Sequence, residues 1–123
     1  MDKKILVVDD EEDVRNAVKA VLEAACFKAI TASNAIDAIK ILRKEKADLV
    51  LIDMFMRGVS GRELCKEIRN DKELKNLKCA FLTVAEFSEA GREELKKMKV
   101  LDYIKKPFDN DDLVRRVKKM LGQ

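Results

Sequence analysis

The chain has 123 residues, of which 47% are hydrophobic and 40% charged, and its net charge is +3. This length and hydrophobic content predict one folded domain over residues 1–123 and exclude a disordered chain. Acidic and basic residues are interspersed and form no concentrated basic face, so we expect no nucleic-acid partner.

The first half of the chain alternates short apolar runs with helical patterns. Residues 5–8 are an apolar run that is too short for a helix, which predicts a buried strand. Over residues 13–25 apolar side chains recur every three or four residues, which predicts a helix with one buried stripe. The next expected elements are a strand at 27–32, a helix at 35–42 capped by Ser33 or Asn34, and a strand at 49–53.

The second half continues this alternation. A third helix is expected to begin near Gly61, and a fourth strand covers 79–83. Residues 88–98 favour a helix, but their apolar stripe is thin, which indicates a weakly anchored, movable element. A fifth strand is expected at 100–105. The last helix has an acidic start and a buried face made of Leu113, Val117, Met120 and Leu121.

Five strand–helix units predict an α/β fold in which a doubly wound, five-stranded parallel sheet is covered by helices on both faces. No signal segment and no apolar stretch of about 18 residues is present. We therefore expect a cytoplasmic protein without membrane association. Cys26, Cys65 and Cys79 form no closely spaced pair, which indicates buried or half-buried thiols in a reducing compartment.

Three aspartates follow the apolar runs, Asp9 and Asp10 after the first and Asp53 after the third. In open α/β sheets, ligands bind at the carboxyl edge of the strands. Carboxylates that share this edge repel one another and raise each other's pKa unless a cation lies among them. The pattern therefore predicts a divalent metal and chemistry on one aspartate. The chain has no histidine, which excludes histidine ligands and histidine acid–base catalysis.

These motifs, in this order, resemble the receiver domain of two-component response regulators over essentially the whole chain. The resemblance implies a flavodoxin-like fold with five helices and the strand order 2-1-3-4-5. The residues that carry it are Asp9, Asp10, Asp53, Met56, Gly61, Thr83, Tyr103, Lys106, Pro107 and Phe108.

The resemblance implies that Asp53 accepts a phosphoryl group from a sensor histidine kinase, a histidine phosphotransfer protein or a small phosphodonor. Mg²⁺ would be held by Asp10 directly, by Asp9 mainly through water, by Asp53 and by the backbone carbonyl of Phe55. Lys106 would pair with Asp53 and then with the phosphoryl group. No separate general base is needed, because phosphoryl transfer depends mostly on positioning and charge.

The resemblance also implies a switch. The hydroxyl of Thr83 would turn toward the new phosphate, and Tyr103 would move into the space that it vacates. A downstream protein would then bind the face made by the fourth helix, fifth strand and fifth helix. We expect a monomeric receiver without an output domain, which is a slow autophosphatase and not a turnover enzyme. A phosphorelay intermediate that passes the phosphoryl group onward remains equally open.

Four positions differ from the usual family pattern. Arg57 stands where a proline is usual, and Val84 where a small residue follows the threonine. Phe55 occupies a position that tunes how water reaches the phosphoryl group, and residues 99–102 lack the usual Gly-Ala. We therefore expect Val84 and Phe55 to make the phosphorylated form slow to hydrolyse.

Two other functions are considered. Arg57 and Val84 leave open a degenerate receiver, which binds partners without phosphorylation. A Mg²⁺-dependent phosphohydrolase of the haloacid dehalogenase type also uses a nucleophilic aspartate, but it requires an acid where this chain has Phe55, and the chain is too short for a cap domain.

Overall fold

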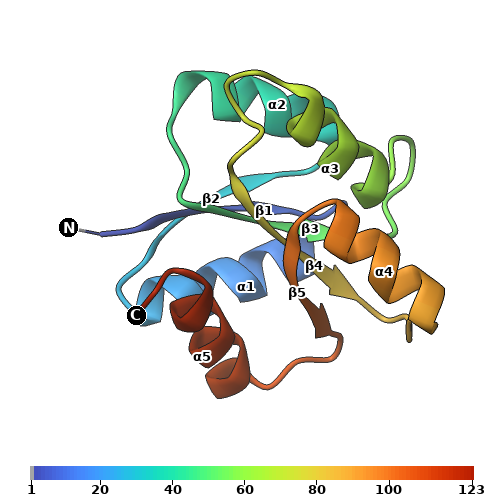
Figure 1. Ribbon diagram of the computed structural model, residues 1–123. Helices are drawn as coiled ribbons and strands as arrows, with labels where there is room; N and C mark the ends of the chain where they lie inside the picture. The colour runs from blue at the N-terminus through green and yellow to red at the C-terminus, as the bar shows by residue number, and fades with distance from the viewer. Residues whose placement is uncertain (1) are drawn as a thin grey trace.

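The computed structural model describes residues 2–123, within which five strands alternate with five helices (Figure 1). The strands are β1 Lys4–Val8, β2 Lys28–Ala32, β3 Leu49–Asp53, β4 Lys78–Thr83 and β5 Val100–Lys105. The helices are α1 Glu12–Ala24, α2 Ala35–Lys44, α3 Gly61–Asn70, α4 Glu89–Lys97 and α5 Asn110–Met120. The predicted elements are all present, with bounds that differ by a few residues. No helix in residues 2–123 combines the length and the apolarity needed to span a bilayer.

The strands form one parallel sheet in the order β2-β1-β3-β4-β5, which confirms the predicted fold class and strand order. Helices α1 and α5 cover one face, and α2, α3 and α4 cover the other (Figure 1). Val8 pairs with Ile52 and Asp53 pairs with Leu82, so β1, β3 and β4 end at nearly the same level. Residues that follow these strands therefore meet at one edge of the sheet.

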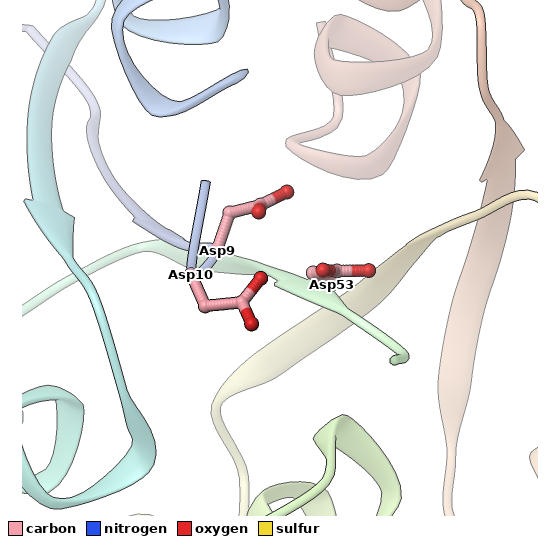
Figure 2. Close-up of side chains that lie close together, drawn as sticks. All are labelled: Asp9, Asp10 and Asp53. Carbon is pink, nitrogen blue, oxygen red and sulfur yellow. The ribbon is translucent and has the colours of Figure 1, made fainter. Parts of the chain in front are cut away.

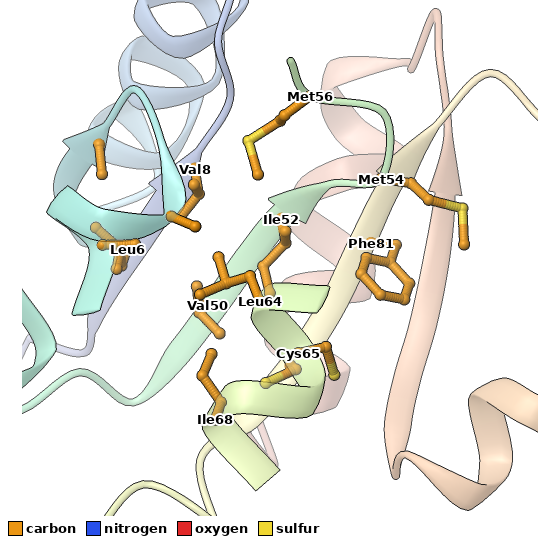
Figure 3. Close-up of a cluster of buried hydrophobic side chains, with 14 of the residues drawn as sticks. Leu6, Val8, Val50, Ile52, Met54, Met56, Leu64, Cys65, Ile68 and Phe81 are labelled. Atoms are coloured by element: carbon orange, nitrogen blue, oxygen red, sulfur yellow. The ribbon is translucent and has the colours of Figure 1, made fainter. Parts of the chain in front are cut away.

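Two buried clusters of side chains fill the space between the sheet and its helices. Successive strand residues point to opposite faces, and because both faces are covered, the central strands β1, β3 and β4 are apolar along most of their length. The cluster beneath α2, α3 and α4 contains Leu6, Val8, Val50, Ile52 and Phe81 from the strands (Figure 3). The cluster beneath α1 and α5 contains Ile5, Val7, Leu49, Leu51, Ala80, Leu82 and Ile104 from the strands.

Helix α4 is attached to this core by few buried side chains. Within Glu89–Lys97, Leu95 is the one buried residue, and Met98 is buried just after the helix ends. On its outer side, Glu94 pairs with Arg62 of α3. The thin apolar stripe predicted for this segment is confirmed, and the structure gives α4 less buried apolar surface than its neighbours.

Helix α1 ends in a left-handed residue that is not glycine. Cys26 has a φ of 69°, and its N–H donates to the carbonyl of Glu23 at 3.0 Å. The N–H of Phe27 donates to the carbonyl of Leu22 at 3.0 Å, which completes a Schellman motif. Phe27 was predicted to begin the second strand, but its N–H closes the helix, so β2 begins at Lys28.

The same turn places Cys26 on the surface. This corrects the expectation of buried or half-buried thiols for Cys26, whereas Cys65 and Cys79 are buried as predicted, and all three thiols are free. Helix α5 ends in the same motif with Gly122, whose φ is 79°, in the left-handed position. Glycine adopts this conformation without steric cost, and Cys26 does not.

We expect Cys26→Gly to raise the free energy of unfolding by about 0.5–1 kcal/mol. A left-handed conformation costs a non-glycine residue about 1–2 kcal/mol, and the greater freedom of glycine in the unfolded chain cancels part of that gain. Urea unfolding measures the change, with Cys26→Ser as the control that keeps the β-carbon. A Gly variant no more stable than the Ser variant would show that the turn is not strained.

Candidate functional site

Three carboxylates lie together where β1 and β3 end (Figure 2). Asp9 and Asp10 follow β1, and Asp53 is the last residue of β3. One carboxylate oxygen from each lies within 4.8 Å of the others. Asp9 and Asp53 are buried and Asp10 is half-buried. The structure thus brings together the three aspartates that the sequence singled out, because β1 and β3 are adjacent and parallel.

Lys106 contacts two of these carboxylates. It follows β5, and its Nζ lies 2.9 Å from Oδ2 of Asp9 and 3.6 Å from Oδ1 of Asp53. Its backbone N–H donates to the carbonyl of Thr83 at 2.7 Å, which ties the loop after β5 to the end of β4. The Lys106–Pro107 peptide bond is cis. The ammonium group therefore binds Asp9 and lies close to Asp53, the predicted phosphoacceptor.

The pKa values of the two partners follow from burial and charge. Burial raises the pKa of Asp53, and the charge of Asp9 raises it further, although Lys106 and the N–H of Phe55 act in the opposite direction. Burial lowers the pKa of Lys106, but its hydrogen bond to Asp9 and the charges of Asp9 and Asp53 outweigh this effect and raise it. Lys106 is thus a cation, and Asp53 is an unusually basic carboxylate.

The charges at this edge do not balance. Three carboxylates against the single ammonium group of Lys106 leave two negative charges, which one divalent cation would neutralise. The donors are hard oxygens, which suit Mg²⁺. The residues present therefore fit a Mg²⁺ site made by Asp9, Asp10 and Asp53. The sequence also predicted the backbone carbonyl of Phe55 as a ligand; its N–H donates to Oδ1 of Asp53 at 3.2 Å, and the role of its carbonyl stays a prediction.

Asp10 has a partner that sequence reasoning missed. The backbone N–H of Arg57 donates to Oδ2 of Asp10 at 3.1 Å, and Nε of Arg57 lies 3.4 Å from the same oxygen. These hydrogen bonds, the backbone one most strongly, lower the pKa of Asp10 despite its partial burial. The sequence indicated only that Arg57 stands where a proline is usual, because nothing in it shows which carboxylate the loop after β3 approaches.

The two residues predicted to form the switch lie on adjacent strands. Thr83 ends β4 and is buried, and its hydroxyl accepts a hydrogen bond from the N–H of Ala85 at 3.0 Å. Tyr103 of β5 is half-buried and opposite Phe81, so it shares a sheet face with Thr83. The ring of Tyr103 lies 4.9 Å from that of Phe87, centroid to centroid, with the guanidinium of Arg92 5.8 Å from its centre.

A groove of about 560 Å³ opens beside Asp53. Phe55 and Val84 lie on its rim, 59% and 66% exposed. Its other side is formed by the first half of α1 and the loop after Lys106. Both bulky residues that the sequence marked as unusual therefore flank the approach to the predicted phosphoacceptor.

Gly61 allows α3 to begin directly against the end of β3. A β-carbon at this position would lie 2.3 Å from the carbonyl oxygen of Asp53 and 2.8 Å from Cα of Met54. The N–H of Gly61 also donates to the carbonyl of Met54 at 3.1 Å. Ser60 and Glu63 then form a capping box that starts the helix. The two ends of the loop that carries Phe55 and Arg57 therefore pack directly against each other.

Comparison with known proteins identifies this arrangement. Residues 5–118 match the family model described as the response regulator receiver domain. The chain belongs to this family. The receiver is therefore a signalling domain of two-component systems, as its motifs suggested.

Relatives and solved structures agree with this assignment. The receiver is 34% identical to sporulation initiation phosphotransferase F of Bacillus subtilis, over 98% of this chain and 95% of that protein. It is 36% identical to the Bacillus subtilis alkaline phosphatase synthesis transcriptional regulatory protein PhoP, over 98% of this chain. The receiver spans about half the length of that regulator, 49%, and 52% of the phosphate regulon regulator PhoB of Pseudomonas aeruginosa.

Among solved structures, a Vibrio cholerae chemotaxis protein matches with a TM-score of 0.90 and 26% identity, over 98% of this chain and 99% of that chain. The response regulator TrrA of Thermotoga maritima, solved in complex with Mg²⁺ and BeF, matches with a TM-score of 0.80 and 36% identity. That match covers 96% of this chain and 98% of the TrrA chain.

We expect Asp53→Asn to stabilise the metal-free receiver at neutral pH. A raised pKa means that the folded state disfavours the ionised carboxylate. Removing the charge should therefore increase the free energy of unfolding. A typical effect of about 1 kcal/mol raises the melting temperature by about 4 °C. The difference should vanish below the ordinary carboxyl pKa of about 4 and grow as pH rises through the raised value.

The matched control is Asp71→Asn. Hydrogen bonds from the N–H of Glu73 and from Arg43 lower the pKa of Asp71, so loss of that charge should destabilise the receiver. Thermal unfolding at several pH values compares the two variants with the parent. A destabilising Asp53→Asn substitution at pH 7 would contradict the assignment of Asp53 as an electrostatically strained group.

Proposed function

We propose that the receiver is a phosphoacceptor that takes a phosphoryl group on Asp53 from a phosphohistidine of a sensor histidine kinase or histidine phosphotransfer protein. The observation that carries this proposal is the contact of Lys106 with both Asp9 and Asp53 at the end of β3. The TrrA structure, with its Mg²⁺ and BeF, supports it by similarity. Family membership supports the class of partner.

In the proposed transfer, a carboxylate oxygen of Asp53 attacks the phosphorus atom and forms an acyl phosphate. The bond between phosphorus and the donor's imidazole nitrogen breaks, and that nitrogen keeps the electron pair. Mg²⁺, when held by Asp9, Asp10, Asp53 and the backbone carbonyl of Phe55, supplies positive charge to the phosphoryl oxygens.

Lys106 and Asp9 act as a pair in this scheme. Lys106 is close enough to Asp53 for its ammonium group to follow the charge from the carboxylate to the phosphoryl oxygens. Asp9 is fully buried and accepts hydrogen bonds from Lys106 and from the N–H of Glu11, each at 2.9 Å, so it fixes where the ammonium group lies. Positioning and charge are what phosphoryl transfer requires.

The proposed output is a change on the face made by α4, β5 and α5. Thr83 would turn its hydroxyl from the N–H of Ala85 toward the phosphoryl group, and Tyr103 would move inward. The weak attachment of α4 supports this proposal, because an element with little buried apolar surface moves at low cost. We propose that residues 1–123 act as one receiver domain, monomeric and without direct nucleic-acid contact, and that a downstream protein binds this face.

We expect acetyl phosphate with Mg²⁺ to phosphorylate the receiver once, on Asp53, without rapid turnover. Intact mass and release of inorganic phosphate are measured for the parent, for Asp53→Ala and for Asp2→Ala, an exposed aspartate away from the site. Loss of modification only in Asp53→Ala supports the phosphoacceptor. No response in the parent would instead indicate a degenerate receiver, and multiple turnovers would indicate a phosphohydrolase.

We expect Val84→Ala and Phe55→Ala each to shorten the lifetime of the phosphorylated receiver several-fold. Both side chains flank the groove beside Asp53, so truncation admits water to the acyl phosphate. Leu101→Ala is the control, because Leu101 is a similarly exposed apolar residue, 50%, on β5 away from this groove. The decay of phosphorylated protein after removal of the donor is followed by mass. A half-life of seconds in the parent would contradict the expectation.

A further inference from the structure

Arg57 places a second cation at the edge of the acidic cluster. Two donors of this residue, the backbone N–H and Nε, reach the same oxygen, Oδ2 of Asp10, at 3.1 and 3.4 Å. The Arg57 side chain is 90% exposed, whereas that of Asp10 is 17% exposed. The guanidinium group is therefore held by Asp10 and by little else, and it can leave at small cost.

The three carboxylates differ in their cationic partners. Asp9 and Asp53 share the partly buried ammonium group of Lys106, which is part of the packed site. Asp10 instead pairs with the exposed guanidinium of Arg57. With Lys106 as the one cation, the three carboxylates leave a net charge of −2 for a divalent cation to bind. When Arg57 is also paired, the net charge of the cluster is only −1.

We infer that Arg57 is an internal competitor of the divalent cation for Asp10, and that it sets the metal affinity of the receiver. This inference rests on the proposed function, since it assumes that Asp10 is a metal ligand. A metal ion bound to Oδ2 of Asp10 would weaken the hydrogen bond from Arg57 to the same oxygen. The positive charge of the guanidinium also repels the incoming cation. The Mg²⁺ concentration needed for phosphorylation is therefore higher than the three aspartates alone would require.

The competition has two separable parts. The guanidinium contributes a positive charge and a long hydrogen bond, and Arg57→Ala or Arg57→Gln removes both. The backbone N–H contributes a shorter hydrogen bond, which these variants keep. Because exposed ion pairs contribute only about 0.2–1 kcal/mol, removing the side chain should tighten Mg²⁺ binding by about 1.4- to fivefold.

The test is a Mg²⁺ titration of the metal-free receiver, followed by amide resonances in NMR spectra. The chain has no tryptophan and one tyrosine, so fluorescence is a poor reporter. The parent, Arg57→Ala and Arg57→Gln are compared with Arg62→Ala. Arg62 is the control for net charge, because it pairs with Glu94 on the helices and not with the acidic cluster.

The expected result is a dissociation constant that is about 1.4- to fivefold lower in both Arg57 variants, an unchanged value in Arg62→Ala, and a difference that shrinks at high salt. Equal affinities of the parent and the Arg57 variants would overturn the inference while leaving the Mg²⁺ site intact. Equal tightening by Arg62→Ala would also overturn it, since net charge alone would then be responsible. No Mg²⁺ binding by any form would overturn both the inference and the proposed metal site.

Discussion

Three carboxylates and one ammonium group share the carboxyl edge of this sheet, and the rest of the site is arranged around their imbalance. The parallel pairing of β1 with β3 forces Asp9, Asp10 and Asp53 together. Lys106 offsets only part of their repulsion. Burial and the neighbouring charge of Asp9 raise the pKa of Asp53, and the unbalanced negative charge favours a divalent cation at this edge.

This imbalance has a cost in stability that the two buried clusters must offset. The central strands are apolar on both faces, and Gly61 lets α3 pack directly on the end of β3, so the acidic edge is held by rigid neighbours. Rigid support is what keeps repelling groups within contact distance. In contrast, α4, which is expected to respond, buries little.

Much of the fold and of the site could be predicted because the signals are local. Apolar runs followed by acidic residues located the strands, and the end of each strand located Asp9, Asp53 and Thr83. What could not be predicted depends on where loops return in space. The left-handed turn at Cys26 lacks the usual glycine, and the pairing of Arg57 with Asp10 joins residues 47 positions apart. No periodic pattern in the sequence records either feature.

The division of the interior into two clusters also separates the helix beside the Asp53 groove from α4. The groove beside Asp53 is built partly on α1, which packs over one cluster, whereas α4 packs over the other. The two clusters lie on opposite faces of the sheet, and each buried strand side chain belongs to one cluster or the other. Side-chain packing in one cluster therefore has no direct contact with packing in the other. Substitutions on α1 beside Asp53 can therefore be accommodated without repacking the layer beneath α4.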